Sequence, residues 1–377
     1  MLLYLHTHFN CPGGGSVWVL ETASRLSKRK MDVKVLSQGA DKKIIKPYKN
    51  IKFEFFGGPP TNSLKHWLFS PYIIKRIFNK IDEINPDIIF PQSFPATHWA
   101  FLYKKKNPDV KCVWMCQEPM AFAHDMDKIL SLRWDLKYVN FAVHPLLKYL
   151  DVYLVRKYAD QILTNSINTY NNAKRIYNRK STIVNVGVDV KKFKPTKKKK
   201  NFVFFASRLT KFKRADVAIR TMKYLKDYKD LKLCIGAGGE EEDNLKKLAK
   251  DLGVENNVEF LGWISQKELQ YYYSKSIATI FMSVNEPCGL VPLESMASGT
   301  PAIATYTGGP KETIINGKTG FFVPPNNPKA VADKIKLIYT NKRLLNRMSK
   351  DSRKHIENNF TWDIVVDKLC NVFERYY

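Results

Sequence analysis

Cysteine is scarce in this chain of 377 residues, which has only six. Cys112 and Cys116 stand four positions apart on a predicted strand, and the other four cysteines are scattered along the sequence. Zinc knuckles and disulfide-stapled domains need cysteines at short, repeated spacings. The sequence therefore predicts neither a zinc site nor a disulfide framework, and we expect free thiols in the reducing environment of the cytoplasm.

Long hydrophobic runs are also missing. The most apolar stretch, 129–155, is interrupted by charged residues, whereas a membrane-spanning helix needs about 20 predominantly apolar residues in a row. The interrupting residues are Arg133, Asp135, Lys137, Lys148 and Asp151. Residues 1–5 lack the basic start of a secretory signal. We expect a cytoplasmic protein without a membrane span.

Acidic residues are few beside the basic ones, with 35 Asp and Glu against 62 Lys and Arg, a formal net charge of +27 and a pI near 9.7. A nucleic-acid-binding protein needs such charge clustered on one face. Here residues 1–190 carry 28 basic and 15 acidic residues, and the remainder carries 34 and 20. This even distribution argues against that class. Polyanionic substrates, a membrane-facing patch and a generally basic surface all fit it.

What the sequence has throughout is alternation of strand and helix patterns. Short apolar strands are predicted at 2–6, 33–37, 51–56, 87–90 and 110–115, with helical patterns such as 17–30, 64–84 and 96–106 between them. The pattern restarts after 191–200, a solvated linker with seven lysines, and continues with strands at 202–206, 231–236, 258–261 and 278–282. Such alternation predicts parallel, doubly wound sheets. We expect an α/β protein of two Rossmann-like domains that face a central cleft.

Two glutamates, Glu286 and Glu294, bracket a short turn that contains Gly289. Glu286 follows the predicted strand at 278–282, and Glu294 lies about one turn into the next predicted helix. Both carboxylates are therefore expected at the carboxyl edge of the second sheet, where open α/β folds bind ligands. Two interpretations remain open from the residues alone, a hydroxyl-rich ligand or the acid–base couple of a hydrolase.

Basic and glycine-bearing loops follow other strands of the same half. Arg208 ends a strand, and Lys213 stands near the amino end of the next helix. A guanidinium fork and an ammonium at a helix start suit a diphosphate, while a solvated basic loop is the alternative in so lysine-rich a chain. Glycine loops at 13–15, 236–239 and 307–309 are either ligand loops or ordinary turns.

Residues 201–325 carry a series of motifs in a fixed order. They are Ser207-Arg208-Leu209 with Lys213, Gly238, Phe260-Leu261-Gly262-Trp263, Glu286 with Glu294, the stretch 297–303, Gly308-Gly309-Pro310-Lys311-Glu312 and the stretch 316–321. This region resembles the family-four retaining glycosyltransferases, also called glycosyl transferases group 1, which have the GT-B fold. The resemblance implies an acceptor-binding domain over 1–190, a donor-binding domain over 191–359 and a last helix, 360–377, that packs back on the first domain.

The resemblance also implies a role for each matching residue. Arg208 and Lys213 hold the donor diphosphate, Glu286 contacts the donor sugar, and these three form the catalytic set. Glu294 binds the ribose hydroxyls. The other donor-binding positions are Gly14, Gly15, Gly238, Trp263, Ile264, Gly289, Leu290 and Val291. Neither a metal nor a cofactor is implied besides the donor itself, a UDP-, GDP- or ADP-sugar.

The first domain departs from the family pattern. Gln117 and Gln92 stand where related sequences often have histidine, and an amide cannot take up a proton, which puts acid–base help from either position in question. We assign Gln117, Glu118 and His124 to the acceptor side. Aromatic and basic residues interleave over 66–78, either as a membrane-facing stripe or as the core side of a helix.

The predicted activity is transfer of a hexose, with retention of configuration, from a nucleotide diphosphate sugar to a hydroxyl of a glycan or a lipid-linked sugar. A sugar-nucleotide epimerase of the same fold and a basic nucleic-acid-binding protein are the alternatives. The sequence leaves open the base, the sugar, the acceptor, the oligomeric state and peripheral attachment to the inner membrane face.

Overall fold

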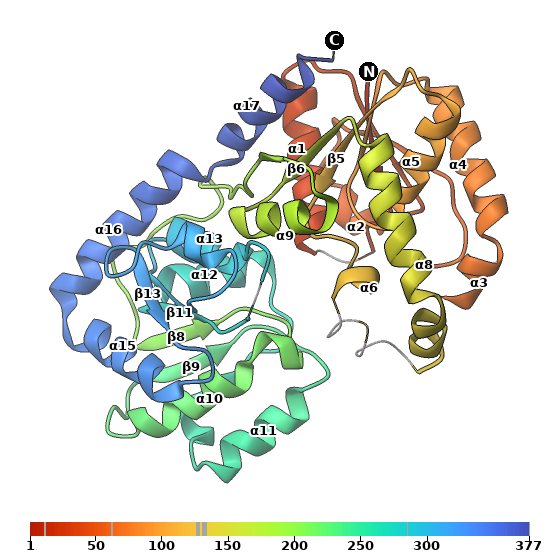
Figure 1. Cartoon of the computed structure of the whole chain (residues 1–377). Helices are drawn as coiled ribbons and strands as arrows, with labels where there is room; N and C mark the ends of the chain where they lie inside the picture. The colour runs from red at the N-terminus through yellow and green to blue at the C-terminus, as the bar shows by residue number, and fades with distance from the viewer. Residues whose placement is uncertain (11–12, 62, 126–128, 130–133, 285, 377) are drawn as a thin grey trace. The chain divides into compact units, whose positions relative to one another are not determined.

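The structure is a computed structural model that describes residues 1–377 except 11–12, 62, 126–128, 130–133, 285 and 377 (Figure 1). Its internal contacts divide the chain into two compact units. The first comprises Met1–Asn185 and Val365–Tyr377, and the second comprises Val186–Ile364. Both are α/β units built on parallel sheets, as the strand–helix alternation predicts.

The first unit contains a seven-stranded parallel sheet in the order β3-β2-β1-β4-β5-β6-β7. Its strands are β1 (Leu2–His6), β2 (Val33–Ser37), β3 (Lys52–Phe55), β4 (Ile88–Pro91), β5 (Lys111–Cys116), β6 (Gln161–Thr164) and β7 (Thr182–Ile183). After β3 the chain returns to the other side of β1. The carboxyl ends of β1 and β4 therefore form a topological switch point, the usual place for a ligand in such sheets.

Helices connect these strands. They are α1 (Gly14–Lys28), α2 (Lys42–Ile45), α3 (Leu64–Leu68), α4 (Ser70–Ile84), α5 (Ala96–Lys106), α6 (Ala121–His124), α8 (Trp134–Tyr158) and α9 (Ile167–Tyr177). The helix predicted over 64–84 is broken at Phe69 into α3 and α4. Pro71 stands in the first turn of α4, where its missing N–H costs nothing, but it has no N–H with which to continue α3.

The last helix, α17 (Trp362–Phe373), ends in the core of the first unit. The ring of Phe373 packs edge-on against Phe90 of β4 at a centroid distance of 5.0 Å. Phe90 also contacts Tyr4 of β1 and Trp18 of α1. Full burial of each such side chain contributes about 1.5–3 kcal/mol, so this aromatic cluster ties the chain's two ends to one sheet.

The second unit contains a six-stranded parallel sheet in the order β10-β9-β8-β11-β12-β13. Its strands are β8 (Phe202–Phe205), β9 (Lys232–Ile235), β10 (Val258–Phe260), β11 (Ala278–Phe281), β12 (Ala302–Thr305) and β13 (Gly320–Val323). Its helices are α10 (Ala215–Met222), α11 (Glu242–Asp251), α12 (Gln266–Lys275), α13 (Leu290–Ala297), α14 (Pro310–Thr313), α15 (Pro328–Thr340) and α16 (Lys342–Asn359). The switch point of this sheet lies between β8 and β11.

Residues 186–188 pack with the segment just before α17, which explains where the units divide. The Val188 amide donates to the Phe360 carbonyl at 2.8 Å, and Val188 forms a β-bridge with Thr361. Gly187 lies so close to Trp362 that a Cβ would come within 2.8 Å of it. The observed divisions at 185/186 and 364/365 differ by a few residues from the sequence-based ones at 190/191 and 359/360.

The lysine-rich stretch 191–200 is not solvated along its whole length, and the prediction was wrong for Lys199. The Lys199 Nζ donates to the carbonyls of Ser274 at 2.9 Å and Gly299 at 2.8 Å, and to the Thr300 hydroxyl at 2.5 Å. Burial lowers the pKa of Lys199 to about 7. A run of lysines looks uniform in sequence, but the fold selects one of them to satisfy buried oxygens next to β11 and β12.

Candidate functional site

The predicted donor residues of the second unit gather at the carboxyl edge of its sheet. Arg208 and Lys213 lie in the loop after β8, and Glu286 lies in the loop after β11. These two strands are neighbours at the switch point. The loops after β9, β10 and β12 add Gly238, Trp263 and Gly309 at the same edge, because all six strands run parallel. Residues far apart in sequence are thus brought to one rim.

The loop after β8 is held in place through its backbone. The Leu209 amide donates to the Gly238 carbonyl at 3.1 Å, and the Leu209 carbonyl accepts from the Glu241 amide at 3.0 Å. The side chain of Leu209 is fully buried, while that of Arg208 is exposed. Among the described residues Arg208 has no ion-pair partner. A buried anchor next to an exposed guanidinium positions a cation at the rim.

Lys213 and Glu286 form an ion pair across the switch point. The Lys213 Nζ lies 2.6 Å from the Glu286 Oε2, with exposed side-chain fractions of 22% and 27%. The loop that carries Glu286 is fixed from the other side, since the Gly309 amide donates to the Glu286 carbonyl at 2.8 Å. The pair therefore joins the residue predicted to hold the diphosphate to the residue predicted to contact the sugar.

Glu294 has a different environment from Glu286. It lies on α13, partly buried, and its Oε2 accepts a hydrogen bond from the hydroxyl of Tyr273 on α12 at 2.9 Å. Burial raises the pKa of Glu294 to about 7, and the hydrogen bond from Tyr273 partly offsets this effect. The two glutamates thus differ in partner and in solvation.

A glycine turn links the two glutamates. Gly289 is the N-terminal capping residue of α13 with φ +85°, a conformation that favours glycine, and a Cβ there would lie 3.3 Å from the ring of Phe281. Leu290 and Val291 form the first turn of α13. The amino end of this helix therefore faces the same rim as Glu286, and helix amino ends favour anions.

The residues predicted to lie by the base come from the loops after β9 and β10. A Cβ on Gly238 would lie 2.7 Å from the indole nitrogen of Trp263, and one on Gly236 would lie 2.7 Å from the Cδ1 of Ile264. The glycines allow this close approach of the two loops. Trp263 is 73% exposed, so its ring presents a flat apolar surface at the rim.

In the first unit, Gly14 and Gly15 open α1 next to Gln117. A Cβ on Gly15 would lie 2.9 Å from the Gln117 Oε1. The Gln117 carbonyl accepts from the Asn165 side chain at 3.0 Å, whereas the Gln117 Nε2 is buried without a partner. His6 Nδ1 at the end of β1 and Gln92 Oε1 after β4 are also buried and unpartnered. These three atoms lie at the carboxyl ends of the neighbouring strands β1, β4 and β5.

His124 and Glu118 follow β5 on the same side of the sheet. The His124 Nε2 lies 2.8 Å from the Oδ2 of Asp151 on α8, and Asp151 is 2% exposed. Asp151 also accepts from the hydroxyl of Tyr177 at 2.8 Å and lies 3.5 Å from the His98 Nε2. The structure places His124 in a packed network that fastens α6 to α8. Glu118 lies in the loop between β5 and α6 that leads to this network.

Sequence reasoning missed Tyr273, Asp151 and Tyr177. Tyr273 is the last of three consecutive tyrosines, and nothing in that pattern marks it as the partner of Glu294. In the sequence, Asp151 is notable only as one of the charged residues that interrupt the apolar stretch 129–155. A lone acidic residue on the otherwise apolar side of a helix was the one available signal for a buried network.

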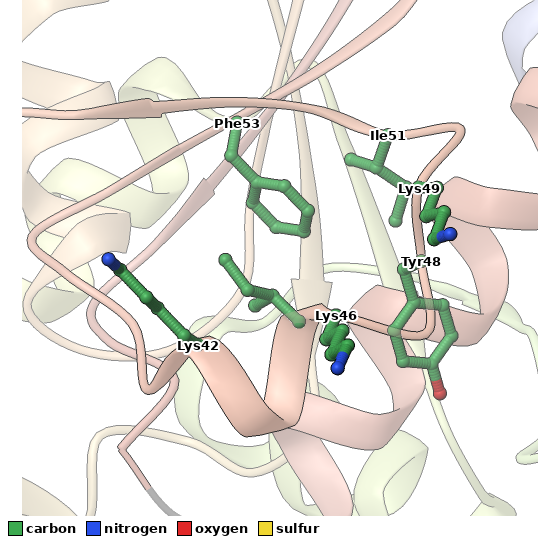
Figure 2. Close-up of a pocket in the computed structure, with 7 residues that line it drawn as sticks. Lys42, Lys46, Tyr48, Lys49, Ile51 and Phe53 are labelled. Carbon is green, nitrogen blue, oxygen red and sulfur yellow. The ribbon is translucent and has the colours of Figure 1, made fainter.

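A shallow hollow of about 440 Å³ lies elsewhere in the first unit, at the amino end of β3 (Figure 2). Its floor is formed by Ile45, Ile51 and Phe53, and Lys42, Lys46 and Lys49 surround it. Figure 2 shows these lysines on separate sides of the hollow rather than converging on one point. None of the predicted site residues lines it, and ligands of such sheets bind at the opposite, carboxyl edge.

The described residues offer neither a metal site nor a membrane span. They contain no group of three or more His, Cys, Asp or Glu side chains arranged to hold a metal ion. None of the described helices is long and apolar enough to cross a membrane. Cys112, Cys116, Cys234, Cys288 and Cys370 are free thiols.

Two family models match most of the chain. The model for Glycosyltransferase Family 4 matches residues 12–192, and the model for Glycosyl transferases group 1 matches residues 188–355. An uncharacterized glycosyltransferase of Haemophilus influenzae is 27% identical over 345 residues, which cover 90% of this chain and 91% of the relative. An uncharacterized glycosyltransferase of Methanocaldococcus jannaschii is 30% identical over 172 residues, which cover 46% of this chain and 44% of the relative.

The chain spans about half the length of several of the curated relatives it matches. Among solved structures, that of Anabaena HepE in complex with UDP-glucose has a TM-score of 0.80 at 18% identity and covers 100% of both chains. At this identity the likeness concerns the fold. The two matched models together span residues 12–355, in the order that the two units follow. The chain therefore belongs to the family 4, group 1 glycosyltransferases, and its two Rossmann-like units are those of the GT-B fold.

Proposed function

We propose that the protein transfers a hexose, with retention of configuration and without a metal ion, from a nucleotide diphosphate sugar to a hydroxyl acceptor. The observation that carries this proposal is the grouping of Arg208, Lys213, Glu286 and Glu294 at the switch point of the second sheet. Two cations suit a diphosphate, and two carboxylates suit hydroxyl groups. That a related fold is known in complex with UDP-glucose supports the same class of donor.

In this proposal Arg208 and Lys213 stabilise the negative charge that develops on the leaving nucleoside diphosphate, which is the role that a metal ion plays in other enzymes. Glu294 accepts hydrogen bonds from the ribose hydroxyls, and Glu286 orients the sugar. The acceptor attacks from the face that the diphosphate leaves, and the departing phosphate takes up the acceptor's proton. Neither carboxylate moves that proton, so the pair does not act as in glycosidases.

The acceptor is proposed to be a glycan or a lipid-linked sugar bound by the first unit. Buried donors or acceptors without a partner cost about 1–3 kcal/mol each, so a ligand that supplies the missing hydrogen bonds is favoured. His6, Gln92 and Gln117 provide such atoms at the carboxyl ends of β1, β4 and β5, where a sugar hydroxyl would satisfy them. The free thiols suit a cytoplasmic enzyme, which we place at the inner membrane face if its acceptor is lipid-linked.

A binding experiment followed by an activity experiment tests the proposal. The melting temperature of the full chain is measured with UDP, GDP and ADP and with their hexose conjugates, because a ligand of the native state raises it. One base is expected to raise it for both the diphosphate and the sugar conjugate, and Glu294→Ala is expected to remove that shift. No shift with any of them would overturn the donor assignment.

Incubation of the identified donor alone separates the transferase from the alternative epimerase. An epimerase converts the sugar of the donor without an acceptor, whereas a transferase releases nucleoside diphosphate only slowly until an acceptor is added. The anomeric configuration of the product, determined by NMR, tests retention. Activity that persists in excess chelator is expected, and loss of activity that added magnesium restores would contradict metal independence.

A further inference from the structure

Half of the exposed large hydrophobic side chains of the described residues lie in two short segments of the first unit. Twenty such side chains are exposed, and ten of them fall within 64–72 and 143–153. The first group is Leu64, Trp67, Leu68, Phe69 and Tyr72, and the second is Val143, Leu146, Tyr149, Leu150 and Tyr153. We call these ten residues the outer aromatic face. Apolar side chains gathered in this way mark an interaction surface.

The part of the outer aromatic face on α8 makes this helix apolar on two sides. Its inner side buries Leu154, Val155 and Tyr158 against the core, together with the paired Asp151. Its outer side repeats Val143, Leu146, Leu150 and Tyr153 at helical spacing and leaves them exposed. A helix of a soluble domain ordinarily keeps its outer side polar, so this second apolar side is expected to meet something other than water.

A continuous series of contacts links the two segments. The ring of Trp67 on α3 stacks on Phe94 at a centroid distance of 5.7 Å, and Phe94 packs edge-on against His98 at 5.0 Å. The His98 Nε2 lies 3.5 Å from the Oδ1 of Asp151, next to Leu150 on α8. Both segments also appear on the same side of the first unit in Figure 1. The outer aromatic face is therefore held on one rigid support.

The exposed charged side chains within the two segments of this face, Lys65 and Lys148, are both basic. Residues 55–81 contain no Asp or Glu but carry exposed Lys65, Lys75 and Arg76. On the part of α8 whose side chains the structure describes, 143–158, the exposed charges are Lys148, Arg156 and Lys157, because the acidic residue of this part, Asp151, is buried. Tyrosine and tryptophan rings interleaved with lysine and arginine suit the boundary between water and an anionic bilayer, where rings enter the headgroup layer and the cations meet lipid phosphates.

We infer that the outer aromatic face docks the protein on an anionic lipid bilayer. The attachment is peripheral, through side chains of α3, the start of α4 and α8. This inference does not depend on the nature of the donor. It gives a physical reason for a lipid-linked acceptor, since docking would place the first unit at the surface from which such a lipid extends.

Sedimentation of the full chain with lipid vesicles tests the inference. Vesicles of phosphatidylcholine with phosphatidylglycerol are compared with vesicles of phosphatidylcholine alone, at low and at high salt. We expect binding to the anionic vesicles that weakens with salt. The variant Leu68→Glu/Tyr72→Glu/Tyr149→Glu, which changes three of the most exposed side chains of the face, is expected to lower the partition coefficient at least about tenfold.

The matched control is Tyr224→Glu/Leu337→Glu, which changes exposed apolar residues of the second unit and is expected to bind vesicles as the unmodified chain does. Lys65→Gln/Lys148→Gln tests the charges, and the partition coefficient is expected to fall about fivefold per lysine.

Unchanged melting temperatures show that the variants fold. The inference is overturned by equal binding to neutral vesicles, by equal loss in the control, or by unchanged binding of the triple variant. It is also overturned if the unmodified chain binds no vesicles and light scattering shows that it is a dimer whereas the triple variant is a monomer.

Discussion

The protonation of Glu294 is expected to control both donor binding and stability. Burial raises the pKa of this carboxyl from an ordinary 4.5 to about 7. Only the ionised carboxylate accepts hydrogen bonds from two ribose hydroxyls through both oxygens. Between pH 6 and pH 8 the ionised fraction rises from about one-tenth to about nine-tenths, so the affinity for a nucleotide diphosphate sugar is expected to rise about tenfold over this range.

The same shift has the opposite effect on stability. Because the pKa of Glu294 is raised in the folded state, the stability it contributes is fully present below pH 4.5 and is lost as the pH rises toward 7. A difference of about 2.5 pKa units corresponds to about 3 kcal/mol. Glu294→Gln removes this titration and is therefore expected to be more stable than the unmodified protein at pH 8, by up to about 3 kcal/mol, while it binds the donor more weakly.

Urea unfolding and calorimetric titration with the donor sugar, each at several pH values, measure the two effects. A donor sugar is preferred to a free nucleoside diphosphate because its diphosphate does not titrate in this range. Tyr273→Phe removes the hydrogen bond that lowers the pKa of Glu294 and is expected to move the binding midpoint to higher pH. Tyr272→Phe is the matched control on the same helix. A donor affinity independent of pH, or a Glu294→Gln variant that is less stable at pH 8, would refute the reasoning.

Three other changes have expected outcomes. Arg208→Ala is expected to reduce turnover at saturating donor by about 10²–10³-fold with a smaller effect on KM, and normal turnover in a steady-state assay would contradict its role at the leaving group. Lys199→Met removes the donor to the Gly299 carbonyl and the Thr300 hydroxyl oxygen and one of the two donors to the Ser274 carbonyl, and should lower the unfolding free energy by about 2–4 kcal/mol in urea, whereas the exposed Lys200→Met should change it little. Gly289→Ala places a side chain at φ +85° against Phe281, and a loss of about 1–3 kcal/mol together with a higher donor KM is expected; a neutral result in both assays would exclude the strained turn.

The alternation of strand and helix patterns was sufficient to predict the α/β class and the parallel sheets. Buried parallel strands appear in a sequence as short apolar runs. This chain contains few other apolar runs that could be mistaken for such strands. The break at Phe69 was missed because the apolar spacing of 64–84 continues through it, and only Pro71 marks it. The burial of Lys199 was missed for a related reason. The composition of a lysine-rich stretch describes all its lysines alike, whereas a tertiary contact involves only one of them.

The residues of the candidate site were named from the sequence, through their spacing and through the resemblance to a known family, but their partners were not. Spacing places a residue on a strand end or on a helix turn, and parallel strands then bring such ends to one rim. It does not say that the hydroxyl of Tyr273 meets Glu294, or that His124, His98 and Tyr177 share Asp151. These contacts depend on how helices from distant parts of the chain pack, and one sequence contains no direct signal for that.

The ion pair between Lys213 and Glu286 shows why partners matter for function. Both side chains are partly exposed, and a pair of this kind contributes about 0–1 kcal/mol. A donor diphosphate that binds Lys213 therefore loses little by breaking the pair, and the same event frees the Glu286 carboxylate to accept a sugar hydroxyl. Residues that sequence motifs assign to two separate parts of the donor are thus expected to change partners together. A buried pair at this position would hold the site closed to the donor, since removing one partner from a buried charge costs several kcal/mol.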